Sequence, residues 1–236
     1  LKTDWGARLL SRLLAWTGTD ARKLVLGFMV ATAIVSTIMS DLPCTALFLG
    51  FALTILRASG ARIGSSNLGK CLMIGIPVAS MTGGIATPAG SSFNVVAMNI
   101  LQQTTGETIS FFDWMIVGVP VSVIMVPVLW FFITTVIKPE AITDACLQDI
   151  RSTAMAAQTV KPYEVKALAV ILLMVVLWIA GNWVPAFDVT VVAIVGLIVM
   201  FLPGMNLITW AEFQAAVPWG IVMLVGAILT VGGVVQ

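Results

Sequence analysis

Two short polar runs interrupt apolar parts of the sequence, and they hold the side chains best suited to binding chemistry. The first contains Ser40, Asp41 and Thr45, and the second covers 82–94, with three glycines and one proline. Hydroxyl, amide and carbonyl oxygens suit a hard cation such as sodium, and the free N–H groups of a helix N-terminus suit an anion. The chain has no histidine, which excludes a catalytic histidine triad and a histidine-ligated metal. The pattern therefore indicates ion binding rather than catalysis.

The composition is that of a protein embedded in a membrane. Of 236 residues, 59% are hydrophobic and 10% are charged, with 12 basic and 11 acidic residues giving a net charge of +1. Those figures exclude a soluble enzyme, a disordered chain and a nucleic-acid-binding protein. Four stretches without Asp, Glu, Lys or Arg are long enough for a helix to cross a bilayer: 114–137, 167–187, 189–211 and 213–236. We therefore expect an all-α, polytopic membrane protein.

The first interrupted segment, 24–56, is uncharged apart from Asp41. One helix of that length would be about 50 Å long, too long for one crossing, and Pro43 disfavours continuous helix. We predict two short helices with a broken tip at 39–45. Because basic residues favour the cytoplasmic side and flank both ends, we expect a re-entrant hairpin that turns near the middle of the membrane. The flanking basic residues are Arg22, Lys23, Arg57, Arg62 and Lys70.

The second interrupted segment predicts one discontinuous transmembrane helix. Half-helices are expected at 69–81 and 94–103, because the Gly, Pro and hydroxyl residues between them cannot sustain a continuous helix. Broken helices at membrane depth are typical of ion or substrate sites in transporters. An external polar loop at 82–94 remains the alternative.

The rest of the chain is assigned by charge and apolar length. Residues 1–18 predict an amphipathic helix in the membrane interface, with a cytoplasmic helix packed on the protein as the alternative. Further crossings are expected at 114–137, kinked at Pro120 and Pro127, and at 167–183, 189–203 and 218–235. The domain organisation is then 1–18, 19–137 for the hairpin, discontinuous helix and following helix, 138–166 as a cytoplasmic loop, and 167–236 as further helices.

Several motifs resemble the divalent anion/sodium symporters, which carry dicarboxylates, citrate or sulfate. Gly83 to Asn94 reads GGIATPAGSSFN and is similar to the family's GGIGTPIGTPPN loop. Ile109 to Pro120, with ISFFDWM and GVP, is similar to ISFFDWMKFGLP. Weaker similarities lie at Leu24–Met29, Ile208–Trp210 and Pro218–Gly220, so the resemblance covers nearly the whole chain.

The resemblance implies two inverted repeats, each with a re-entrant hairpin and an unwound helix, in a homodimer that works by an elevator-type movement. This chain would hold the first hairpin and first unwound helix and stop before the second hairpin. A small anion, sodium and the lipid bilayer are the implied partners, with no cofactor and no nucleic acid. The candidate substrate and ion residues are Ser40, Asp41, Thr45, Thr87, Gly90, Ser91 and Asn94; the candidate sodium ligands are Ser40, Asp41, Gly84, Thr87 and Asn94.

One position departs from the family. The family's hairpin tip reads Ser-Asn-Thr, whereas this chain has Ser40, Asp41 and Leu42. An ionised Asp41 about 5 Å from a bound anion would cost about 3 kcal/mol at an effective dielectric near 20. Asp41 is therefore a sodium ligand, a protonated group that couples transport to protons, or a sign of a different substrate; a helix-capping role towards Thr45 is the structural alternative. Asn94 has a similar alternative as an N-cap.

The leading hypothesis is sodium-coupled symport of a di- or tricarboxylate, or another divalent anion, in the plasma membrane (the inner membrane of a bacterium). The alternatives within the family are a proton-coupled carrier and an anion exchanger. A passive anion channel would also use broken helices. An intramembrane enzyme or assembly subunit is the third class, and the lack of histidine argues against the enzyme.

Overall fold

The computed structural model describes residues 20–60, 65–140, 162–181, 189–205 and 207–217, with isolated positions elsewhere. Every element in this part of the chain is helical, so the all-α prediction is confirmed. The elements are α2 (Ala21–Ser36), α3 (Asp41–Ala58), α4 (Asn67–Gly84), the 3₁₀ turn η1 (Pro88–Gly90), α5 (Ser92–Thr105), α6 (Phe111–Ile137), α8 (Pro162–Ala180), α9 (Val189–Phe201) and α10 (Trp210–Ala216).

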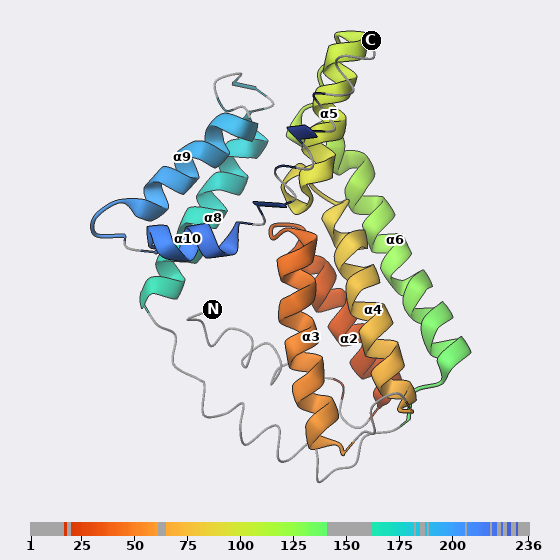
Figure 1. The fold of residues 1–236 in the computed structure, drawn as a ribbon. Helices are drawn as coiled ribbons and strands as arrows, with labels where there is room; N and C mark the ends of the chain where they lie inside the picture. Colours follow the sequence, from red (N-terminus) through yellow and green to blue (C-terminus); the bar gives the residue numbers. More distant parts are fainter. Residues whose placement is uncertain are drawn as a thin grey trace.

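Helices α2, α3, α4 and α6 lie side by side in one bundle, and α5 stands at the far end of α4 (Figure 1). Helices α2 and α4 are both central, because each packs against the three other helices, and α2 carries much of the apolar core. Its Leu24, Val25 and Phe28 are fully buried, and Phe28 meets Phe48 of α3 edge to face with ring centroids 6.5 Å apart. This apolar core fixes the end of α2 relative to α3 and α4, where the polar runs lie.

The turn of the first helical pair lies earlier than the sequence predicts. Helix α2 ends at Ser36 and α3 begins at Asp41, so the break is at 37–40 rather than 39–45. Pro43 is helical because it is the third residue of α3, where a backbone N–H has no intrahelical partner to lose. The predicted pair of short helices is present, with 16 residues in α2 and 18 in α3.

The second interruption is shorter than predicted. Helix α4 continues to Gly84 and α5 begins at Ser92, which leaves 85–91 outside α-helix. The gap contains η1, where the Thr87 hydroxyl accepts from the backbone N–H of Gly90 at 3.0 Å. The first half-helix therefore ends three residues later than the predicted 69–81. The second begins two residues earlier than the predicted 94–103. The break therefore covers seven residues, 85–91.

Helix α6 is the described helix whose length and apolar composition suit a full membrane crossing. Its 27 residues correspond to about 40 Å. Ser110 and Asp113 form a reciprocal capping box at its start, and the helix continues through Pro120 and Pro127. Large apolar side chains project outward along it, including Val117, Val123 and Phe131, each about two-thirds exposed.

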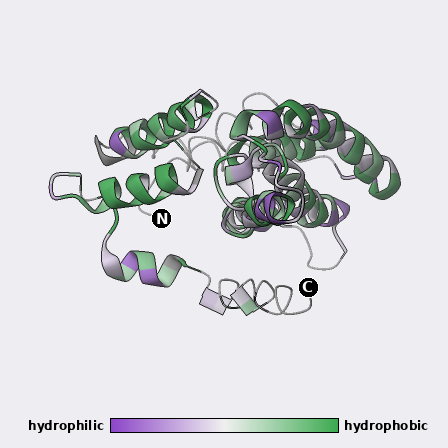
Figure 2. Ribbon diagram, turned by 90° about the horizontal axis from the view of Figure 1, so that it is seen from above, coloured by the Kyte–Doolittle hydropathy of each residue, from purple (hydrophilic) through white to green (hydrophobic). Residues whose placement is uncertain are grey.

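Helices α8 and α9 form a second, smaller group beside the bundle (Figure 1), with hydrophobic residues along most of both ribbons (Figure 2). They correspond to the crossings predicted at 167–183 and 189–203, and α8 begins five residues earlier. Most of 1–18, 138–166 and 218–235 lies outside the described residues, so the interfacial helix, the cytoplasmic loop and the last crossing remain predictions.

Candidate functional site

The two polar runs lie in contact, although about 45 residues separate them along the chain. The Thr87 hydroxyl donates to the carbonyl oxygen of Thr37 in the turn between α2 and α3. The backbone of Gly90 lies so close that an added Cβ would be 2.6 Å from the Gly84 oxygen and 2.8 Å from the Ser36 oxygen. Only glycine permits this approach. The turn therefore rests directly on the unwound segment of α4 and α5.

Asp41 is the charged residue at this contact. Its Oδ1 accepts from the Ser36 hydroxyl at 3.1 Å, and Ser91 lies beside its carboxylate. A Cβ on Gly84 would overlap Asp41 Oδ1, so the carboxylate occupies the space that a side chain at 84 would fill. The N-cap of α3 is Ser40, whereas Asp41 is the first residue of the helix. The capping interpretation of Asp41 is therefore wrong in its geometry, and its role as an ion ligand stays a prediction.

Asn94 ties the two ends of the interruption together. Its side-chain nitrogen donates to the Gly84 oxygen at 2.7 Å and to the Thr87 oxygen at 2.9 Å, and the residue is 8% exposed. The N-cap of α5 is Ser91, so the alternative of Asn94 as an N-cap is wrong. Both amide hydrogens are used on carbonyls, which leaves Oδ1 as the Asn94 atom able to face a cation.

The structure brings most of the predicted site residues together and leaves two at the margin. Ser40 is exposed on the outer side of the turn, and its side chain makes no capping hydrogen bond. Thr45 is half-buried, one turn into α3. The residues that meet at the contact are Asp41, Gly84, Thr87, Gly90, Ser91 and Asn94.

Four further residues at the contact were not among the predicted site residues, although Trp114 and Gly118 lie in the motif from Ile109 to Pro120. Ser36 and Ser80 are fully buried and bond to Asp41 and to each other. The Trp114 indole donates to the Ile85 oxygen at 2.8 Å, and Gly118 packs against the same carbonyl group. A serine in an apolar helix often bonds only to its own helix. No local signal therefore distinguishes Ser36 and Ser80 from serines of that kind.

The first turns of α3 and α5 converge at this contact, because Asp41 opens α3 and lies beside Ser91, the residue at the N-cap position of α5. Each first turn presents backbone N–H groups without intrahelical partners and the positive end of a helix dipole. Neither 24–56 nor 71–137 contains a lysine or arginine. An anion bound against these two first turns would therefore depend on backbone N–H groups and hydroxyls.

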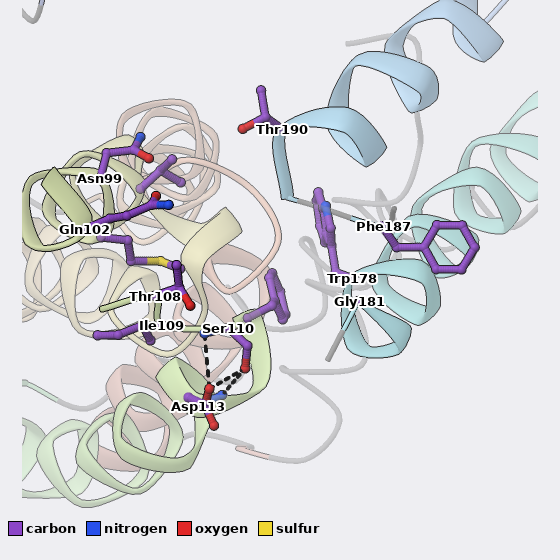
Figure 3. A pocket seen from close by; sticks show the side chains of 13 residues that line it. Asn99, Gln102, Thr108, Ile109, Ser110, Asp113, Trp178, Gly181, Phe187 and Thr190 are labelled. Carbon is purple, nitrogen blue, oxygen red and sulfur yellow. Dashed lines mark hydrogen bonds between the residues drawn. The ribbon is translucent and has the colours of Figure 1, made fainter. Parts of the chain in front are cut away.

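A cavity of about 440 Å³ lies elsewhere, between α5, the start of α6 and the α8–α9 pair (Figure 3). Its floor includes Phe111 stacked on Trp178 at 5.2 Å. None of the predicted site residues lines it, so the cavity and the polar contact are separate features. The lining residues are Val95, Met98, Asn99, Gln102, Thr108, Ile109, Ser110, Phe111, Asp113, Trp178, Gly181, Phe187 and Thr190.

Comparison with known proteins places the chain in a family. Residues 2–236 match the family model described as "Citrate transporter". The sodium-dependent dicarboxylate transporter SdcS of Staphylococcus saprophyticus is 25% identical, over 93% of this chain and 46% of the relative. SdcS of Staphylococcus aureus is 24% identical, over 89% and 44%, and a membrane protein of Cupriavidus necator is 22% identical, over 98% and 45%.

The chain spans less than half the length of these relatives. The match extends across the hairpin turn, the unwound segment and the helices that follow. The resemblance to the divalent anion/sodium symporters is thereby confirmed, and the chain belongs to the citrate transporter family.

Proposed function

We propose that this chain is part of a secondary active transporter that moves a di- or tricarboxylate, or another divalent anion, together with sodium. The observation that carries the proposal is the meeting of two helix N-termini at a turn and an unwound segment, with no basic side chain in either segment. Such an arrangement suits an anion and a hard cation held side by side. The names of the SdcS relatives support both the dicarboxylate and the sodium.

The same proposal assigns the elements to the membrane. Helix α6 crosses it, with its exposed apolar side chains facing lipid. Helices α2 and α3 are about 24 and 27 Å long, each shorter than the bilayer core of about 30 Å. A re-entrant hairpin that keeps both basic flanks in the cytoplasm fits these lengths. The whole protein is then a multi-pass protein of the plasma membrane, a homodimer that alternates access by an elevator movement.

Sodium is proposed to bind where oxygen atoms converge. Its proposed ligands are the carboxylate of Asp41, the hydroxyl of Ser91 and Oδ1 of Asn94, with the carbonyl oxygens of Gly84 and Thr87, each of which keeps a lone pair after accepting from Asn94. The anion would lie beside it, against the first turns of α3 and α5. A cation between the carboxylate and the anion would remove their mutual repulsion.

The test is uptake of labelled succinate, citrate and sulfate into proteoliposomes that contain the complete parent protein. Sodium and proton gradients are imposed separately, with liposomes lacking protein as the control. We expect accumulation of at least one anion driven by the sodium gradient. Accumulation driven only by protons would replace sodium with proton coupling, uptake only with anion inside would indicate an exchanger, and conductance far above carrier turnover would indicate a channel.

A further inference from the structure

The position of Asp41 presents an electrostatic problem. A carboxylate about 5 Å from a single negative charge of a bound anion would weaken binding by roughly a hundredfold at an effective dielectric near 20. Asp41 begins α3, the helix whose N-terminus is proposed to attract the anion. Its side chain, however, lies against Gly84 on the inner side of the turn, whereas Ser40 and Leu42 occupy the exposed side, Leu42 with 60% of its surface accessible.

Two buried serines hold Asp41 in this orientation. The Ser36 hydroxyl is 3.1 Å from Asp41 Oδ1 and 2.7 Å from the Ser80 carbonyl oxygen. The Ser80 hydroxyl is 2.9 Å from the Asp41 carbonyl oxygen and 3.2 Å from the Ser36 hydroxyl. Both serines are fully buried. This serine cluster, Ser36 of α2 and Ser80 of α4, thus contacts both the side chain and the main chain of Asp41.

The two serines contact different parts of Asp41: the Ser36 hydroxyl reaches the carboxylate, and the Ser80 hydroxyl reaches the main-chain oxygen. Each hydroxyl has one hydrogen and two acceptors in range, so the two serines supply two hydrogens to four contacts. Removing Ser36 frees the carboxylate, and removing Ser80 takes away the hydroxyl that bonds to the Asp41 main chain. Ser91 also lies beside the carboxylate, but it belongs to the unwound segment on the α5 side.

We propose that Ser36 and Ser80 are positioning residues that hold the Asp41 carboxylate against Gly84, where the sodium proposed above stands between it and the bound anion, and so set the affinity for that anion. This inference rests on the proposed transport function. It explains how the turn can carry an acidic residue beside an anion site: the negative charge is kept on the inner side of the turn. A carboxylate released from the cluster would turn towards the anion and weaken its binding.

The test uses the complete protein in proteoliposomes at saturating sodium. We expect Ser36→Ala to raise the KM for the transported anion about tenfold and Ser80→Ala severalfold, with kcat changed less than twofold. Thr32→Val is the matched control, because this fully buried hydroxyl bonds to Phe28 of its own helix and lies one turn from Ser36. In an Asp41→Asn background, Ser36→Ala and Ser80→Ala should change KM less than twofold. An equal rise in that background, or no rise with Asp41 present, overturns the proposal.

A second measurement separates this inference from the proposed function. Thermal unfolding of the purified full-length protein gives a double-mutant cycle for Ser36 and Asp41 that requires no transport. We expect the two substitutions to be non-additive, and Thr32→Val to be additive with Asp41→Asn. Coupling without any anion uptake would keep the positioning cluster and reject the transport function, whereas additivity of Ser36 and Asp41 would reject the cluster itself.

Discussion

The turn on the unwound segment and the cavity beside α8 and α9 satisfy their polar groups in different ways. At the turn, Ser36 and Ser80 bond across 44 residues and Thr87 reaches back 50 residues to Thr37. At the cavity, Ser110 and Asp113 bond to each other within one helical turn, and Asp113 is exposed. The first region is therefore specified by long-range contacts between buried groups, and the second by local contacts that solvent could replace.

This difference predicts that substitutions at the turn lower the folding stability far more than equivalent substitutions at the cavity or on exposed helix faces. Packing gives the largest expected effect. Gly83→Ala would place a Cβ onto the main chain of Ala33, including its carbonyl oxygen, and no side-chain rotation relieves that overlap. We expect about 3 kcal/mol of destabilisation, at the upper end of overpacking effects. Thermal unfolding of the complete protein in detergent measures it.

Gly50→Ala is the matched control for that substitution. Gly50 is also helical, but nothing lies within 4 Å of a Cβ built on it. Alanine at a helix interior is more favourable than glycine by about 0.5–1 kcal/mol. We expect Gly50→Ala to stabilise the protein slightly. Equal effects at the two glycines would show that the close approach of α4 to α2 does not exist.

Hydrogen bonding gives the next largest effect. Asn94→Ala removes the donor that satisfies the Gly84 and Thr87 carbonyl oxygens, and leaving such buried groups unpaired costs about 1–3 kcal/mol. We expect about 2 kcal/mol of lost stability, measured as a lower unfolding temperature. Asn99→Ala, one and a half turns later on the same helix and exposed at the cavity, should change stability by less than about 0.5 kcal/mol. Similar losses at both positions would remove the distinction between the two regions.

The same contrast explains what the sequence could predict. Glycine and proline mark the interruptions through local backbone preferences, so the existence of both breaks could be predicted from 39–45 and 82–94. The exact turn could not, because Pro43 is compatible with the first turn of a helix as well as with a break. The partners of Ser36, Ser80 and Asn94 lie on other elements, and a single sequence carries no signal for such pairs. The cavity depends on how the α8–α9 pair packs against the start of α6, which is equally non-local.

The local capping contact at the start of α6 is expected to have a smaller effect on folding stability. Ser110 caps α6 by accepting from the Asp113 backbone N–H at 3.1 Å, while Asp113 accepts in return. Ser110→Ala should cost about 1 kcal/mol, the usual value for a lost N-cap. Ser110→Thr should recover most of that stability, because threonine keeps a hydroxyl that can accept from the Asp113 N–H and donate to the Asp113 carboxylate. A loss with Ser110→Ala as large as that of Asn94→Ala would mean that the cavity wall is as constrained as the turn.

The smallest expected effect on folding stability depends on pH and arises at the N-terminal end of α4. The backbone N–H groups of Asn67 and Leu68 donate to the Glu140 carboxylate and lower its pKa. Because the folded pKa lies below the unfolded one, the stabilisation is present at neutral pH and is lost as the pH falls below the ordinary glutamate value of about 4.3 and through the lowered pKa. Glu140→Gln should therefore lower the unfolding temperature slightly at pH 7, and the difference from the unsubstituted protein should shrink towards pH 3.

Glu107→Gln, in the exposed connection between α5 and α6, provides the matched glutamate for this experiment. Both variants lose one carboxylate, so a general effect of net charge would appear in both. A helix-capping role requires that the pH-dependent difference be larger for Glu140→Gln, because only that carboxylate accepts the first N–H groups of α4. Identical pH profiles would assign the effect to net charge and leave Ser66 as the cap that matters at this end of the helix.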